Sequence, residues 1–315
     1  MSLDKVLYNF ARRGVMPWMK GNVGSGPLSV DSQGRMITTD VGKTYFVAGN
    51  YGSDLYDGSS WDKAFATLAA AIAANNTNIA ANHHGWAARN KIYISGDTFA
   101  EVLVAFPNKC DVIGVGSYDA NDQPGITGNH APVNAANYGT RFINVRFKAT
   151  ATASPLITLA SSSSGLQALG CTFDGTAGTV TTGITNSLSP FMKVLDCKFI
   201  GAFATANISL ATGALVDIDI SRNTMMGSAG VGILVNSGTT VSYGGIIRDN
   251  FISSAGICIN DASGKFNIVG NRVITALAKG TAGANGITGG AYMMLDNRVS
   301  ASDLANGVVP AQGTL

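Results

Sequence analysis

Short strand-like runs recur along the chain with apolar and polar residues in the same order. Aligned on one shared position, here called the ladder slot, they place at that position Val145, Cys171, Cys197, Asn223, Asn250, Asn271 and Asn297. Successive slots are 26, 26, 26, 27, 21 and 26 residues apart. An apolar residue follows each slot by two positions: Phe147, Phe173, Phe199, Met225, Ile252, Val273 and Val299. Residues i and i+2 of a strand face the same side, so both sets are predicted to point inward in a chain that coils into a solenoid.

A stack of coils explains why asparagine and cysteine share the slot. Equivalent residues of successive coils lie about 4.8 Å apart, so an inward Asn side chain can bond to neighbouring backbone and to the Asn of the next coil. Cysteine is small and readily buried, so Cys171 and Cys197 are predicted to fill the slot by packing. A disulfide between them is the alternative, but in-register neighbours on adjacent strands have poor geometry for one.

A second set of strand-like runs follows the first after loops of variable length. These runs are GITNS from residue 183, NISLA from 207, GILVNSG from 232, GICIND from 256 and GITGG from 286. Solenoids tolerate such variation because insertions project from one face. The runs KIYISG from residue 91 and DVIGVGSYD from residue 111 are predicted to begin the stack. We expect roughly seven or eight coils between about residues 91 and 300.

Two stretches, together with the ladder, resemble a known family. They are GNYGSDLYDGSSWDKAFATLAAAIAA, residues 49 to 74, and DVIGVGSYD. Both are similar to segments of the right-handed parallel β-helix group, the pectate-lyase-like superfamily, which includes bacteriophage tailspikes and virion appendages. The resemblance implies an all-β, right-handed parallel β-helix over about residues 41 to 300. It implies little about activity, because this fold hosts lyases, hydrolases and structural proteins.

The first of these stretches also predicts a capping helix from its residues alone. Ser60 is a candidate N-cap and Trp61 would open the helix. Its apolar stripe would consist of Ala64, Phe65, Leu68, Ala71 and Ile72. Such a helix would cover the open end of a stacked β-coil, whose strand edges otherwise face water. Asp54 and Asp57 offer a weaker calcium hypothesis; we favour a solvated turn there.

The N-terminus is predicted to be an assembly anchor. Leu3, Val6, Leu7 and Phe10 fall on one face of a short helix that Gly14 ends. Aromatic and Met residues outside a domain core indicate a partner surface. The complete predicted anchor is Leu3, Val6, Leu7, Phe10, Met16 and Trp18. The alternative is that this helix folds back onto the β-helix. We therefore expect an N-terminal helix and linker over 1–40, a lead-in segment with the capping helix over 41–90, the β-helix over 91–300 and a C-terminal tail over 301–315.

Composition excludes several functional classes. The 315 residues carry a net charge of +2 and are 13% charged, with no concentrated basic face of the kind that nucleic-acid binders show. No run of about 18 apolar residues predicts a membrane span. The four cysteines form no CxxC pair, so no zinc site, other metal or cofactor is expected. His83, His84 and His130 lie in expected loops and are weak candidates for metal ligands.

Candidate chemistry is sparse. In the run DIDI, Asp217 and Asp219 would lie on one outward face about 6 to 7 Å apart, near the lower end of the carboxylate spacing of inverting glycosidases. They are weak catalytic candidates, and a solubilising role is favoured. Charged residues next to the slot suggest opposite-sign columns on the outer face. They are Asp196, Arg222, Asp249 and Asp296 before the slot, and Arg146, Lys198, Arg272 and Arg298 after it. The catalytic signatures of the resembling family are absent.

Taken together, the sequence and the resemblance predict a structural virion protein of a bacteriophage. It would be a β-helix spike or a capsid decoration (head fibre), made in the host cytoplasm and exposed on the particle surface. Its expected partners are other virion proteins, bound through the N-terminus, and two further copies of the chain in a homotrimer. A cell-surface glycan is a further candidate partner. The alternatives are a polysaccharide-degrading tailspike, either lyase or glycoside hydrolase, and a non-catalytic glycan-binding module.

Overall fold

The structure is a computed structural model that describes residues 29–30, 36–37, 42–81, 88–116, 122–132, 137–150, 154–160, 163–176, 180–187, 189–276, 286–289, 293–295, 297–301 and 304–308. The chain divides into two compact units, Met1–Val41 and Gly42–Leu315. In the first unit, strands β1 (Ser29–Val30) and β2 (Met36–Ile37) pair antiparallel. All six residues of the predicted anchor lie outside the described residues.

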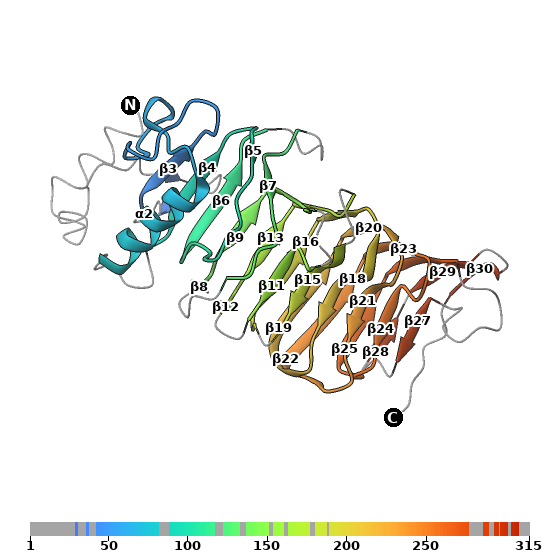
Figure 1. The fold of residues 1–315 in the computed structure, drawn as a ribbon. Helices are drawn as coiled ribbons and strands as arrows, with labels where there is room; N and C mark the ends of the chain where they lie inside the picture. The colour runs from blue at the N-terminus through green and yellow to red at the C-terminus, as the bar shows by residue number, and fades with distance from the viewer. Residues whose placement is uncertain are drawn as a thin grey trace, which may run out of the picture. The chain divides into compact units, whose positions relative to one another are not determined.

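The second unit is an all-β parallel solenoid built from three main sheets, whose strands follow one another along the stack in Figure 1. Sheet 1 contains β3 (Thr44–Val47), β4 (Asn90–Ile94), β6 (Cys110–Gly114), β9 (Arg141–Ile143), β13 (Gln167–Leu169), β16 (Lys193–Leu195), β19 (Gly213–Ser221), β22 (Thr239–Arg248), β25 (Phe266–Val269) and β28 (Met293–Leu295). Sheet 2 contains β5 (Thr98–Phe99), β7 (Gly125–Thr127), β10 (Arg146–Lys148), β14 (Thr172–Asp174), β17 (Lys198–Ile200), β20 (Thr224–Ser228), β23 (Phe251–Ser254), β26 (Arg272–Thr275), β29 (Arg298–Ala301) and β30 (Leu304–Val308). Sheet 3 contains β11 (Ile157–Leu159), β15 (Val180–Asn186), β18 (Phe203–Leu210), β21 (Val231–Val235), β24 (Ile259–Asp261) and β27 (Ile287–Gly289).

Within the described part of this unit, six successive coils contribute a strand to all three sheets, from β9–β10–β11 to β25–β26–β27. Two earlier coils, β4–β5 and β6–β7, contribute to sheets 1 and 2. A small fourth sheet pairs β8 (Asn137–Tyr138) with β12 (Ser163–Ser164). Neighbouring strands of the three main sheets run parallel except at the end of sheet 2, where β30 pairs antiparallel with β29. The predicted parallel solenoid is confirmed.

The predicted inward apolar column runs in register through sheet 2. Phe147 pairs with Phe173 and Phe173 with Phe199, and the column continues through Met225, Ile252 and Val273. The backbone register extends from Val273 to Val299. The rings of Phe147 and Phe173 stack with centroids 5.4 Å apart, and those of Phe173 and Phe199 with centroids 4.5 Å apart. These three rings are fully buried. Stacking between consecutive coils therefore adds to the burial energy that holds the first half of the solenoid together.

The asparagine ladder is also confirmed. The Oδ1 atom of Asn250 accepts hydrogen bonds from the backbone N–H (2.9 Å) and the carboxamide (3.0 Å) of Asn223. Asn271 accepts the same pair of bonds from Asn250, and Asn297 accepts them from Asn271. Each amide thus satisfies the slot N–H of the preceding coil, which would otherwise be buried without a partner.

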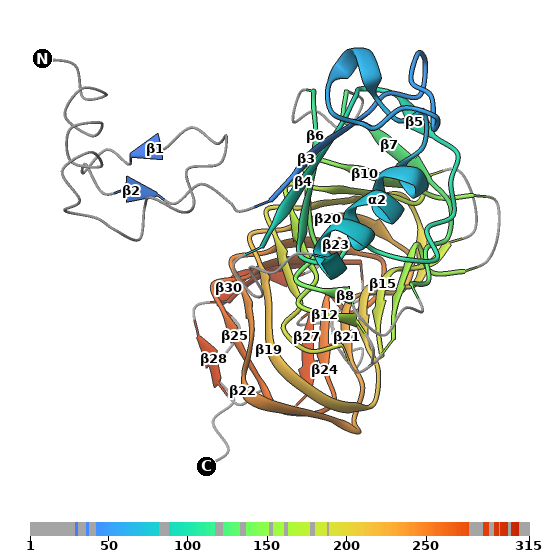
Figure 2. The same ribbon diagram turned by 90° about the vertical axis from the view of Figure 1, so that its left-hand side faces the viewer.

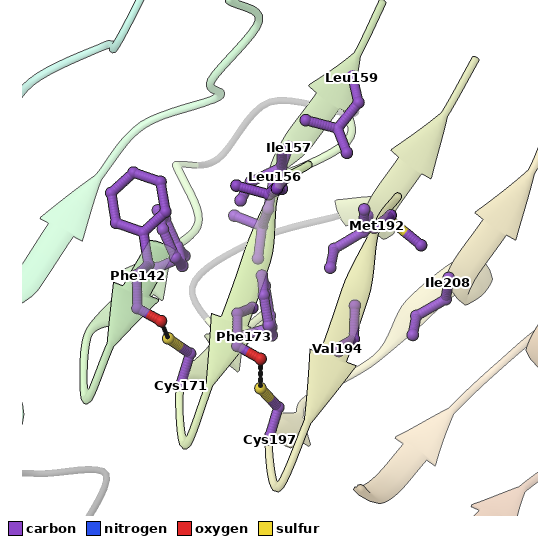
Figure 3. Packing of buried hydrophobic residues seen from close by; sticks show 14 of the residues in the cluster. Phe142, Leu156, Ile157, Leu159, Cys171, Phe173, Met192, Val194, Cys197 and Ile208 are labelled. Atoms are coloured by element: carbon purple, nitrogen blue, oxygen red, sulfur yellow. Dashed lines mark hydrogen bonds between the residues drawn. The ribbon is translucent and has the colours of Figure 1, made fainter. Parts of the chain in front are cut away.

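The cysteines at the slot make the corresponding donor bond. The Cys171 thiol donates to the Phe142 carbonyl at 3.2 Å, and the Cys197 thiol donates to the Ala168 carbonyl at 3.3 Å. Figure 3 shows both thiols pointing at the backbone of the preceding coil. The two cysteines are free and buried, as expected for packing residues.

The residue before each of the first six slots forms a tight bend that the sequence pattern did not predict. At this position Asn144, Gly170, Asp196, Arg222, Asp249 and Gly270 have φ between 54° and 66°. This left-handed conformation is strained for side chains other than Gly, and Asn and Asp tolerate it best. The bend turns the chain from sheet 1 into sheet 2 and places the next residue inside the stack.

The helix of the lead-in segment begins later than predicted. Residues Trp61–Lys63 form a 3-10 turn, Ser60 makes no capping bond, and Phe65 forms a β-bridge with Val47. Helix α2 spans Leu68–Ala81.

Carboxylates from other segments hold the start of α2. Both oxygens of Glu101 accept backbone N–H groups of Leu68 and Ala69 at 2.9 Å, and Asp54 accepts those of Ala66 and Thr67 at 2.9 Å. Because these partners are distant in sequence, local capping rules misplaced the start of the helix. The helix contacts β3 and β4, beside which it lies in Figure 2. That it closes the open end of the stack stays a prediction.

Candidate functional site

The two catalytic candidates lie in β19, but not on a regular strand. The register between β19 and β22 shifts between Val216 and Ile218, and Asp217 has a φ of 48°. Isoleucines Ile218 and Ile220 point into the core, as expected. The side chain of Asp217 is 47% exposed and that of Asp219 is 17% exposed. The irregularity lies at the start of the run DIDI, and within the run the aspartates and isoleucines still alternate between the outside and the inside.

Each of these carboxylates has its own cationic partner on a neighbouring coil. Lys193 Nζ lies 3.7 Å from Asp217 Oδ2, and Arg248 Nη2 lies 3.6 Å from Asp219 Oδ2. The Ser221 hydroxyl also donates to Asp219. The arrangement ties three successive strands of sheet 1 together through side chains, which is the role that cross-strand ion pairs usually play on a partly exposed sheet.

Other acids on the outer face are engaged in the same way. Asp196 and Arg222, on successive bends, form two contacts of 2.7 Å, and the hydrogen bond from Arg222 lowers the pKa of Asp196. Both residues precede a slot, so this pair joins neighbouring members of one predicted column, and the pairing between the two columns stays a prediction. Arg146 pairs with the buried Asp174 instead of a residue before the slot. Burial alone would raise the pKa of Asp174, but bonds from Thr176 and Arg146 lower it.

The turn acids proposed as calcium ligands bind backbone and hydroxyl groups. Asp54 accepts from Ala66 and Thr67 at the start of α2. Asp57 accepts from the backbone N–H of Ser59 at 3.0 Å and from its hydroxyl at 2.7 Å. In the part of the chain that the structure describes, no three His, Cys, Asp or Glu side chains are grouped so that they could hold a metal ion.

His130 is a core residue of the second coil. Its Nδ1 accepts the backbone N–H of Leu103 at 3.1 Å, and its ring packs edge-on against Phe147. Burial lowers its pKa to about 4, so it is neutral at pH 7. His83 and His84 lie outside the described residues.

The thiols are equally unsuited to chemistry. Burial raises the pKa of Cys197 well above its usual value and that of Cys258 to about 12. Reactive cysteines need an accessible thiolate, so these side chains serve packing.

One surface feature was missed by the sequence reasoning. On the outer face of sheet 1, apolar residues of successive strands are aligned by register into one column: Phe46, Tyr93, Ile113, Ile143, Leu169 and Leu195. We call this column the apolar stripe. Its members are partly exposed, whereas the preceding residue in each of the six strands, from Tyr45 to Val194, is buried. The signal was present in the runs KIYI, DVIG, RFIN, QALG and KVLD, which place apolar residues at two consecutive positions and so on both faces of the strand.

Within the described residues, no helix is long and apolar enough to cross a bilayer. Comparisons of the chain with protein-family models, with curated proteins and with solved structures found no match in any of the three.

Proposed function

We propose that this chain is a structural virion protein of a bacteriophage, a β-helix spike or capsid decoration that its N-terminal segment attaches to the particle. The observation that carries the proposal is the continuous side-chain stack inside the solenoid, from the phenylalanine rings to the asparagine ladder. Such a stack makes neighbouring coils cohere along the whole axis, which suits a rigid rod that projects from a surface.

The proposed attachment site belongs to the N-terminal unit. The chain divides after Val41, so the predicted anchor residues belong to a different compact unit from the solenoid. The apolar face of the predicted N-terminal helix, formed by Leu3, Val6, Leu7 and Phe10, offers apolar surface to a larger assembly together with Met16 and Trp18. Docking through this unit would leave the faces of the solenoid available for contacts between copies, and we include a homotrimer in the proposal.

The test is to add the purified full-length chain back to phage particles that lack it. Leu7→Asp with Phe10→Asp should abolish decoration, because two charges would enter the docking face. Tyr8→Asp with Asn9→Asp adds the same charge on the other side of the predicted helix, so it should leave decoration intact. Equal binding by both variants would show that the apolar face of the N-terminal helix is not the anchor. Failure of the unaltered chain to bind particles would contradict the virion role itself.

The competing hypotheses are a polysaccharide-degrading tailspike and a glycan-binding module. The ion pairs of Asp217 with Lys193 and of Asp219 with Arg248 favour a structural role for both acids. A general acid or base in a glycosidase must be free to exchange a proton with the substrate. Loss of a measured turnover on substitution of these acids would promote the enzymatic hypothesis.

A further inference from the structure

We propose that the apolar stripe on sheet 1 is a self-association face, and that a second copy of this chain occupies it with the symmetry axis parallel to the solenoid axis. This inference rests on the self-association included in the proposed function, but it concerns the solenoid alone and does not depend on the virion role. It identifies which face of the rod meets another copy.

The stripe is continuous in space although its members are far apart in sequence. Register places Tyr93 beside Ile113, Ile113 beside Ile143, and Leu169 between Ile143 and Leu195. Six residues span five coil spacings, or about 24 Å. The ring of Phe46 stacks on that of Tyr93 at 5.8 Å and extends the stripe to the first strand of the sheet.

Exposed apolar residues also lie at both ends of the strands that carry the stripe. Val115, just after β6, is 45% exposed; Tyr138 precedes β9 and is 44% exposed; Phe191 precedes β16 and is 45% exposed. An apolar surface that is both long and flanked by exposed aromatic residues is typical of an interaction site.

When the rotation axis runs parallel to the solenoid axis, each residue near the axis faces the same residue of the second copy at the same height. A charged residue there would face a like charge, so charge decides which column can lie at the axis. The other outward column of sheet 1 contains Lys91, Asp111, Arg141, Lys193 and Asp219. On sheet 2 the corresponding column contains Arg146, Lys198 and Arg272. Symmetry would set like charges against each other along either column, which is unfavourable.

The second outward column of sheet 2 contains Lys148, so symmetry would set like charges against each other there as well. An outer column on sheet 3 is uncharged but polar. It aligns Thr158, Thr185, Ser209, Leu234 and Asn260. Burying hydroxyl and amide groups without new partners costs free energy, whereas burying the stripe removes apolar area from water. A second copy also presents the same coil spacing, so its apolar side chains meet those of the stripe at every level. By register the column of the stripe continues beyond Leu195 into Ser221 and Arg248, so only its six apolar levels suit a second copy. Over these levels the stripe is the column that fits a second copy best.

The experiment measures the mass of the full-length chain by sedimentation equilibrium at several concentrations. The unaltered protein should sediment as a multiple of 32.3 kDa. Ile143→Glu with Leu169→Glu should weaken association by at least about 100-fold, because like charges would meet at two levels of the interface. Thr158→Glu with Thr185→Glu is the matched control on sheet 3, also on adjacent coils in register, and should leave the mass unchanged.

A cysteine variant keeps the test informative if the charged variant misfolds. Leu169→Cys should form a dimer with a short bis-maleimide crosslinker, since the native thiols are buried and position 169 would face its own copy. Thr185→Cys should remain uncrosslinked. The proposal is overturned if the unaltered chain is monomeric at every concentration. It is equally overturned if the sheet 3 control dissociates the assembly as strongly as the stripe variant, or if Leu169→Cys does not crosslink within an assembled protein.

Discussion

Replacing Asn250 with leucine tests the ladder most directly. Asn250 is 1% exposed. Its Oδ1 accepts two bonds from Asn223, and its carboxamide donates to the Ile220 carbonyl and to Asn271 Oδ1, both at 2.9 Å. Leucine removes all four bonds. It leaves the backbone N–H of Asn223 buried without the partner that it has in the native stack.

The magnitude follows from these contacts. A buried N–H without a partner costs about 1–3 kcal/mol, and each of the other three lost bonds costs about 0.5–1.5 kcal/mol. The buried leucine side chain offsets part of this with about 1.5–3 kcal/mol of apolar burial. We expect the free energy of unfolding to fall by about 2–4 kcal/mol, and the Tm to fall by roughly 3–7 °C.

Thermal melts followed by circular dichroism provide the assay, and Asn267→Leu is the matched control. Asn267 lies on the outer side of β25, is only partly buried, and its carboxamide oxygen has no hydrogen-bond partner. The same substitution there should change stability by less than about 0.5 kcal/mol. If Asn250→Leu melts at the temperature of the parent or of the control, the ladder does not stabilise the stack and the reasoning is refuted.

Three further predictions concern other parts of the chain. Glu101→Gln should lower the free energy of unfolding by about 1–2 kcal/mol in the same melts, because the carboxylate accepts two N–H groups at the start of α2 and its negative charge interacts favourably with the helix dipole. An unchanged Tm would count against this cap. Because burial lowers the folded-state pKa of His130 to about 4 from an unfolded value near 6.5, its contribution to stability is complete above about pH 6.5 and is lost as the pH falls toward 4. Urea titrations should show that His130→Gln flattens this part of the pH profile, and an identical slope in the variant would exclude the histidine as its source. Asp217→Asn with Asp219→Asn should leave the fold and particle binding unchanged, and no new reducing ends or unsaturated uronates should form from bacterial polysaccharides with either protein; turnover by the parent that the double variant lacks would contradict the structural role.

The sequence predicted the inside of the solenoid well because the relevant pattern is local. A slot and an apolar residue two positions later define one face of a strand, and the recurrence of this pair defines the coil. The left-handed bend before the slot recurs just as regularly. Its sequence signal, an Asn, Asp or Gly residue at the bend, is interrupted by Arg222. Reading the other five bend residues as left-handed formers would have located the bend from sequence.

The parts that sequence reasoning missed depend on contacts between distant segments. The start of α2 is set by Glu101, more than 30 residues further along the chain. The bulge at Asp217 depends on the register between β19 and β22. The apolar stripe required the register of five strand pairs before its members could be recognised as neighbours. Local propensity does not encode such relations.

The slot and the apolar position after it change together along the stack, which gives the alternation of Cys and Asn a packing reason. Coils with Val145, Cys171 or Cys197 at the slot carry phenylalanine two residues later, whereas the coils with asparagine at the slot carry methionine, isoleucine or valine. The interior is therefore filled in two ways, with rings beside an apolar or thiol slot residue and with thioether or aliphatic side chains beside an amide.

Both slot residues donate to an equivalent carbonyl: the thiol of Cys197 to Ala168 and the carboxamide of Asn223 to Val194, each 29 residues earlier. Coils with valine or cysteine at the slot are joined through stacked rings, and coils with asparagine through hydrogen-bonded amides. The two kinds meet where Asn223 Oδ1 accepts the backbone N–H of Cys197 at 2.9 Å. The first amide of the ladder is thus hydrogen-bonded to the last coil of the phenylalanine stack. The two kinds of contact therefore follow one another along the solenoid without a gap.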